Sequence, residues 1–281
     1  MNMWLCLFNM RPLYKYLNVN SALSMMRGRN PQFTNPLYFN DPFDSHPDLF
    51  DFGVPDGYRL GWAPKSFIKN KAKLDSENNR QRVWISCLSK RNDSMLMWSY
   101  YTNHRGVCIG LNEDALKKDL CHLGLCLLCE DVKYRNIREK PNGIRNVDLF
   151  YQFFTKGEEW QHEQEVRFAI IDPHPSIPYR VMRPTKRNEI IPWTEVRLYP
   201  RLSSNCFQSI YLGERVTDAD KLSILRCVKA FLPDVKVFQM IADNTTFSFV
   251  EEPLDVDKYL SEHPVTFKLN IKTKLHKLMK M

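Results

Sequence analysis

The sequence lacks any apolar stretch long enough to span a membrane. The apolar run at residues 4–8 is too short for a signal peptide, and no Lys or Arg precedes it. These absences argue against an integral membrane protein and against a secreted one. We therefore expect a chain of the reducing cytoplasm with no membrane partner.

Several catalytic signatures are also missing. There is no Walker loop, no glycine fingerprint for dinucleotides, no His-Glu-x-x-His and no Gly-x-Ser-x-Gly. These absences argue against P-loop enzymes, Rossmann dehydrogenases, zincins and α/β-hydrolases. No internal repeat and no linker is visible, so residues 1–250 are expected to form a single domain.

Eight cysteines are present, and none is expected to hold a metal. Cys87 and Cys108 lie in apolar, strand-like runs, which is typical of reduced, buried thiols. Cys121, Cys126 and Cys129 have a spacing similar to that of an iron–sulfur site. The residues between them are mostly leucines, which favours burial, so we expect no metal site and no tightly bound cofactor.

The formal net charge of +8 is partly local. Five lysines and no acid lie between residues 266 and 281, which leaves +3 for the rest of the chain. We interpret residues 251–281 as a basic C-terminal tail. Such a tail is typical both of a solvated terminus and of a segment that binds nucleic acid or anionic lipid.

Strand-like and helix-like segments follow one another without regular βαβ alternation. This order predicts an α+β fold with a mixed, largely antiparallel sheet flanked by helices. Strands are expected at 13–16, 83–89, 107–111, 166–171, 196–199, 209–212 and 235–241, and helices at 22–27, 67–79, 93–101, 113–120, 147–154 and 218–232.

The segment 156–168 is the most unusual in composition. If a strand begins at Glu163, then Glu163, Glu165 and Arg167 share one face, while Val166 and Phe168 face the core. Two carboxylates on one face can divide acid–base work, and Arg167 can hold one of them by a bidentate pair. The alternative is the polar outer face of an edge strand.

Two further segments carry polar candidates. Asn40 and Asp41 lie in a turn, Asn-Asp-Pro-Phe-Asp, that can place polar groups over a pocket. His104 follows the helix expected at 93–101, where a cation at the C-terminal end is also favourable for structural reasons. Ligand binding and a purely structural role stay open for each.

Four segments occur together in the order of a known family: Leu-Tyr-Lys-Tyr at 13–16, Phe-Asn-Asp-Pro-Phe-Asp at 39–44, Met-Trp-Ser-Tyr-Tyr at 97–101 with Gly-Val-Cys-Ile-Gly at 106–110, and Trp-x-x-Glu-x-Glu-x-Arg at 160–167. The chain resembles the bacterial domain-of-unknown-function family numbered 2971 over residues 13–241. The family has no established activity. The resemblance implies a cytoplasmic bacterial protein with a suspected role in phage defence.

A more remote resemblance is to ADP-ribosyltransferases, which split NAD. These enzymes carry a basic residue or His on a first strand, a Ser-Thr-Ser-like strand and a later Glu-x-Glu strand. Lys15, the run Ser86–Ser89 and the pair Glu163 and Glu165 come in the same order. The resemblance implies Glu165 as the main catalytic carboxylate and Glu163 as the group that activates the acceptor. Its implied substrate-binding residues are Lys15, Ser86 and Ser89, with aromatic rings for nicotinamide stacking at Tyr16, Trp98 and Tyr101.

Three functions therefore remain as expectations. The first is an NAD-consuming transferase or glycohydrolase, with a small nucleotide as its partner. The second is a metal-dependent nuclease or nucleic-acid-binding effector that uses Glu163, Glu165 and Asp41. The third is a binding or sensor protein without catalysis. The sequence leaves the oligomeric state open.

Overall fold

The structure is a computed structural model that describes residues 12–46, 64–122, 126–137, 147–171 and 197–264. Ten strands form one large sheet in which the pairing of β10 with β11 is parallel and every other pairing is antiparallel. The expected α+β class with a largely antiparallel sheet is thus confirmed. The strands are β1 Pro12–Leu17, β2 Phe33–Thr34, β3 Val83–Ser89, β4 Val107–Asn112, β5 Cys126–Asp131, β8 Glu165–Ile171, β9 Arg197–Leu198, β10 Phe207–Leu212, β11 Lys236–Ala242 and β12 Phe249–Pro253. A separate parallel pair consists of β6 Lys133–Arg135 and β7 Thr155–Gly157.

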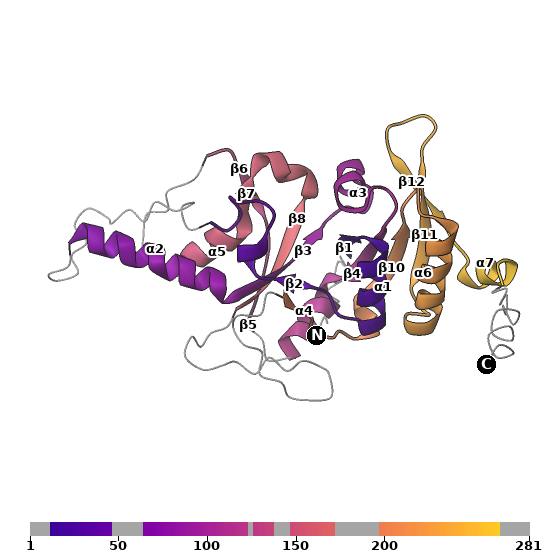
Figure 1. Cartoon of the computed structure of the whole chain (residues 1–281), viewed down its shortest axis with the longest axis horizontal. Coiled ribbons are helices and arrows are strands. Elements are labelled where there is room, and N and C mark those ends of the chain that lie inside the picture. Colours follow the sequence, from indigo (N-terminus) through magenta and orange to yellow (C-terminus); the bar gives the residue numbers. More distant parts are fainter. Residues whose placement is uncertain (1–11, 47–63, 123–125, 138–146, 172–196, 265–281) are drawn as a thin grey trace, which may run out of the picture.

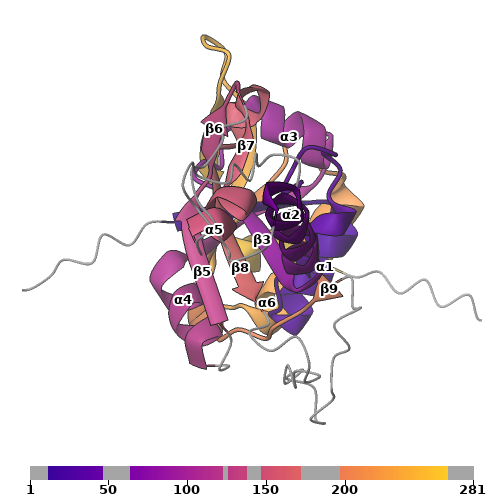
Figure 2. The same cartoon turned by 90° about the vertical axis from the view of Figure 1, so that its left-hand side faces the viewer.

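Helices lie on both faces of the sheet (Figures 1 and 2). The α-helices are α1 Val19–Gly28, α2 Lys65–Gln81, α3 Met95–Thr102, α4 Glu113–His122, α5 Val147–Phe154, α6 Asp218–Phe231 and α7 Val256–Glu262. Short 3₁₀ helices occur at η1 Pro36–Tyr38, η3 Glu158–Glu163 and η4 Ser204–Cys206.

The main hydrophobic core covers one face of the sheet. Helices α1, α4 and α6 bury apolar side chains such as Met26, Leu116 and Leu225 there. Val166 and Phe168 of β8 belong to this core, which confirms the orientation expected from strand alternation.

Two smaller apolar clusters lie on the opposite face. One contains Met97 and Trp98 of α3, and the other contains Phe153 and Phe154 of α5. Helices α3 and α5 thus cover separate parts of this face. The candidate site lies on this side of the sheet.

Strand β3 is the junction of the sheet. One of its edges pairs with β8 along all seven residues, from Val83 opposite Ile171 to Ser89 opposite Glu165. Its other edge pairs with β1 only at Ser89 and with β2 only at Ile85. The strands β1 and β2 therefore diverge along one edge of β3 and leave its backbone open at Cys87.

The sheet extends further along the chain than the sequence suggested. The strand at 235–241 was expected to be the last, but β12 pairs with β11 beyond it and crosses residue 250. Leu254, Val256, Tyr259 and Leu260 then pack against the main core. Residues 251–264 are accordingly part of the folded unit, and residues 265–281 of the expected tail lie outside the described residues.

The cysteines of the described part form no disulfide. Cys108, Cys206 and Cys227 are buried, as expected for reduced thiols. Cys121 is exposed, because it lies in the last turn of α4 and not in an apolar strand. The expectation of burial is therefore wrong for Cys121.

Candidate functional site

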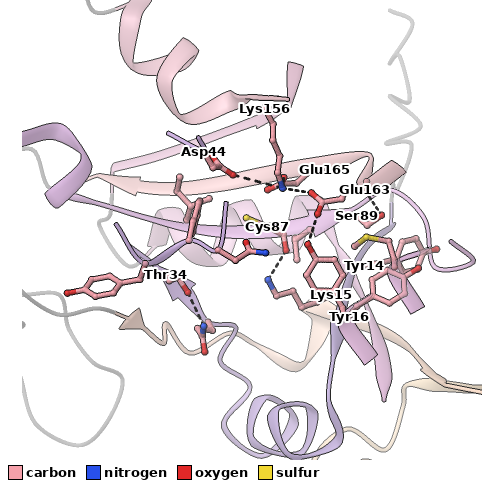
Figure 3. A pocket seen from close by; sticks show the side chains of 18 of the residues that line it. Tyr14, Lys15, Tyr16, Thr34, Asp44, Cys87, Ser89, Lys156, Glu163 and Glu165 are labelled. Atoms are coloured by element: carbon pink, nitrogen blue, oxygen red, sulfur yellow. Dashed lines mark hydrogen bonds and ion pairs between the residues drawn. The ribbon is translucent and has the colours of Figure 1, made fainter. Parts of the chain in front are cut away.

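A cavity of about 340 Å³ lies where β1 and β2 diverge. Its lining comes from β1, β2, β3 and β9, from η1 and the turn after it, from α3, and from the residues around η3. Lys15 spans the open edge of β3, because its Nζ donates a 2.8 Å hydrogen bond to the Cys87 carbonyl oxygen. The split in the sheet thus creates the hollow, and a cationic side chain borders it (Figure 3).

Glu163 and Glu165 both line this cavity, although they do not share a strand. Strand β8 begins at Glu165, and Glu163 is the last residue of η3. Gln164 between them takes a left-handed conformation with φ of 43°, which turns the chain. The expected strand start at Glu163 is therefore wrong, but the turn still brings both carboxylates to one side.

Lys156 of β7 links the acidic side chains of the cavity (Figure 3). Its Nζ lies 2.5 Å from Glu163 Oε2, 3.4 Å from Glu165 Oε2 and 4.0 Å from Asp44 Oδ2. The Tyr101 hydroxyl donates a 2.5 Å hydrogen bond to the other Glu163 oxygen. One ammonium group thus serves three carboxylates.

Arg167 of β8 holds two carboxylates of this cluster in place. Its side chain is 0% exposed, and all five of its N–H groups are bonded. Two of these N–H groups donate to the Asp44 carboxylate, two donate to the Glu165 carboxylate, and the fifth donates to the Phe153 carbonyl oxygen. The polar side of β8 is therefore a buried ion network, and the interpretation as the outer face of an edge strand is wrong.

The environments of the two glutamates move their pKa values apart. Burial raises the pKa of the Glu163 carboxyl; Lys156 opposes the rise, and Glu165 adds to it. Burial would also raise the pKa of Glu165, but Arg167 and Lys156 outweigh it and hold this pKa well below its ordinary value. Such a division is typical of sites in which one carboxylate stays ionised and the other exchanges a proton.

Further expected residues line the same cavity. Lys15, Tyr16, Asn40, Ser89 and Tyr101 all belong to its lining. The Ser89 hydroxyl donates a 2.7 Å bond to the Glu163 carbonyl oxygen, so Ser89 positions the backbone that carries the carboxylate.

Four other expected residues do not line the cavity. Ser86 lies opposite Phe168 in the β3–β8 register, so it faces the main core. Trp98 is buried and donates from its ring nitrogen to the Asn92 carbonyl oxygen. Asp41 accepts a hydrogen bond from the Phe43 amide and so holds the turn, and His104 packs against Phe249.

Sequence reasoning missed Lys156, Asp44 and Arg197, which also line the cavity. Lys156 lies inside the segment described as unusual, and Asp44 lies inside the turn expected to place polar groups over a pocket. A buried pair of carboxylates requires a compensating cation, and this requirement was the signal that could have identified Lys156. Arg197 lies in a two-residue strand and carries no comparable signal.

The arrangement leaves little room for a metal on these carboxylates, because Lys156 already occupies the position between them. Within the described ranges no group of three metal-ligating side chains was found. No helix of the same ranges is long and apolar enough to cross a membrane.

Residues 97–168 match the family model described as Protein of unknown function (DUF2971). The match confirms the family resemblance expected from the motifs. It covers about a quarter of the chain, from α3 to the first half of β8, and it includes Tyr101, Lys156, Glu163, Glu165 and Arg167. No curated protein and no solved structure matches the chain.

Proposed function

We propose that this cavity cleaves the nicotinamide–ribose bond of NAD, as an ADP-ribosyltransferase or an NAD glycohydrolase does. The observation that carries the proposal is the pair Glu163 and Glu165, which line one cavity with oppositely shifted pKa values. Lys15 on β1, Ser89 on β3 and Glu165 on β8 lie on neighbouring strands. This is the order in which the resemblance places the basic residue, the serine strand and the catalytic glutamate.

The charge balance at the carboxylate end of the cavity suits a developing cation. When the C1′–N bond breaks, its electron pair leaves with nicotinamide and positive charge develops on the ribose. Asp44, Glu163 and Glu165 outnumber Lys156 and Arg167 by one charge when all are ionised. The Glu165 carboxylate is held in place by Arg167, so it is oriented before the reaction begins.

Glu163 is the proton acceptor in this proposal. Water or an acceptor hydroxyl forms the new bond to C1′, and its proton passes to the Glu163 carboxylate. A raised pKa makes Glu163 a better base than an ordinary carboxylate near neutral pH. Tyr101, bonded to the same carboxylate, orients it toward the cavity.

The test is release of nicotinamide from NAD, which both transfer and hydrolysis produce. We expect Glu165→Gln and Glu163→Gln each to lower the rate per folded molecule by about 10²-fold or more. Tyr101→Phe removes one hydrogen bond to Glu163 and leaves all charged side chains in place, and we expect a smaller loss of rate. The matched control is Glu159→Gln, an exposed carboxylate of the same 3₁₀ helix, and it should keep the wild-type rate.

Retention of the wild-type rate by both Glu163→Gln and Glu165→Gln would show that the carboxylates are structural, which favours the sensor interpretation. EDTA should leave the rate unchanged. Loss of activity in EDTA with recovery in Mg²⁺ would favour the nuclease alternative instead. The suspected role in phage defence is compatible with NAD depletion and stays part of this proposal.

A further inference from the structure

The cavity has a second end whose chemistry differs from that of the carboxylate end. Thr34 of β2, Arg197 of β9 and Lys15 of β1 line it (Figure 3 labels Thr34 and Lys15). Figure 3 shows Thr34 well apart from Glu163, with Lys15 between them. This end offers hydrogen-bond donors, whereas the other end is dominated by acceptors.

The register of the strands places these donors on one side of the sheet. Thr34 is the cross-strand partner of Ile85 on one side and of Arg197 on the other. Directly opposed residues of an antiparallel pair share a face, so Arg197 and Thr34 point the same way. Lys15 is bonded at Cys87, two residues from Ile85, which is roughly 7 Å along the strand.

The hydrogen-bond pattern leaves the Thr34 proton available. Tyr199 donates to Gln32 Oε1 over 3.3 Å, and Gln32 Nε2 donates to Thr34 Oγ1 over 2.9 Å. The Thr34 oxygen is thus an acceptor within this chain of bonds. Its own O–H has no acceptor in the part of the chain that the structure describes.

The two cations are unmatched as well. At the cavity, the ion pairs join Lys156 and Arg167 to the three carboxylates, and no ion pair among the described residues involves Lys15 or Arg197. The donor end therefore carries two positive charges with free N–H groups. Charge-assisted donors without a carboxylate partner are what a phosphate group requires.

We propose that Thr34, Arg197 and Lys15 form a phosphate subsite, so that the cavity takes a phosphorylated nucleotide and not a nucleoside. The ribose then lies toward Glu163 and Glu165, and its 5′-phosphate lies between Lys15 and Arg197. The inference rests on the proposed function for the identity of the ligand as a nucleotide. The subsite itself rests on the donor geometry alone.

The experiment compares binding of adenosine, AMP, ADP and ADP-ribose by calorimetry and by thermal shift. For the wild type we expect ADP-ribose and ADP to bind at least tenfold more tightly than adenosine. Arg197→Met and Thr34→Val should each remove most of that difference while leaving the weak binding of adenosine unchanged. Arg201→Met is the matched control, because Arg201 is exposed, does not line the cavity and changes the net charge equally.

Three results would overturn the subsite: equal affinity for adenosine and ADP, wild-type ADP affinity in Arg197→Met, or an equal loss in Arg201→Met. Failure of the subsite can be distinguished from failure of the proposed NAD cleavage. Arg197-dependent binding of ADP without nicotinamide release would support the subsite and contradict the proposed reaction. Nicotinamide release with an unchanged KM for NAD in Arg197→Met would support the proposed reaction and contradict the subsite.

Discussion

Arg167 is the residue on which the ion network depends. It is fully buried, and its five donors are shared between Asp44, Glu165 and a backbone carbonyl. A buried charge of this kind contributes little net stability compared with an apolar residue, but it is costly to remove from its partners. Removal of Arg167 leaves three buried carboxylates with Lys156 as their one shared cation.

We therefore expect Arg167→Met to lower the free energy of unfolding by about 3–5 kcal/mol. Urea denaturation followed by circular dichroism measures this loss. Arg201→Met, on the exposed surface, should stay within about 0.5 kcal/mol of the wild type. Asp44→Asn leaves Arg167 paired with Glu165 and should cost less than Arg167→Met; a larger cost would contradict the central position of Arg167.

The two glutamates should affect stability with opposite dependence on pH. The pKa of Glu163 is raised in the folded state. Its contribution to the free energy of unfolding is therefore present below about pH 4.5 and is lost as pH rises through the folded pKa. The pKa of Glu165 is lowered in the folded state. Its contribution to the free energy of unfolding is therefore present above about pH 4.5 and is lost as pH falls toward the folded pKa.

The measurement is the free energy of unfolding between about pH 3.5 and pH 7 for the wild type and both Gln variants. As pH rises, the stability of the wild type relative to Glu163→Gln should fall, and its stability relative to Glu165→Gln should rise. Slopes of the same sign would mean that the two carboxyls share one environment. The buried pairing of Glu165 also implies that Glu165→Gln costs stability, so its activity has to be expressed per folded molecule.

At the scale of elements, the sequence predicts strands better than it predicts the ends of helices. Strand β3 occupies the expected residues, and β1, β4 and β8 differ by a residue or two at their ends. Helix α3 was expected to begin at residue 93, but it begins at Met95 with Ser94 as its N-cap, and α6 ends at Phe231, one residue earlier than expected. Adjacent residues with equal capping ability cannot be distinguished without the backbone geometry.

The last helix of the described residues, α7, is an element that the sequence did not reveal. Its side chains are only half-buried, so it lacks the apolar periodicity by which helices are recognised. Tyr259 packs beside Lys221 of α6, and the Leu254 amide donates to the Val237 carbonyl oxygen. These contacts attach the helix to the main core.

We predict that a chain ending at Pro253 is less stable than one ending at Pro264 by about 3 kcal/mol. The reason is the apolar surface of Leu254, Val256, Tyr259 and Leu260, which the shorter chain leaves uncovered. Thermal unfolding of the two chains side by side measures the difference. Equal melting temperatures would mean that α7 is only loosely attached.

At the scale of the whole molecule, the site shows which information local sequence carries. Lys15, Tyr101, Glu163 and Glu165 come together as the motifs suggested. The pairing of Asp44 with Arg167 was not foreseeable, because the two residues lie more than a hundred positions apart in the chain. The turn at Gln164 was equally hidden, since glutamine seldom adopts a positive φ. Local patterns predict which side chains are polar, while long-range pairing decides which of them become buried partners.

The junction strand β3 also has a consequence for how the protein unfolds. Among the described strands, β3 alone is shared by three groups: β1 with β4, β10, β11 and β12; β2 with β9; and β8 with β5. Each group has pairings of its own, but among the described strands it is joined to the other two groups only through these seven residues. Loss of β3 therefore separates all three groups from one another at once. Because Lys15, Thr34 and Glu165 bring all three groups to the cavity, local unfolding of β3 would destroy the cavity even where the pairings inside a group persist.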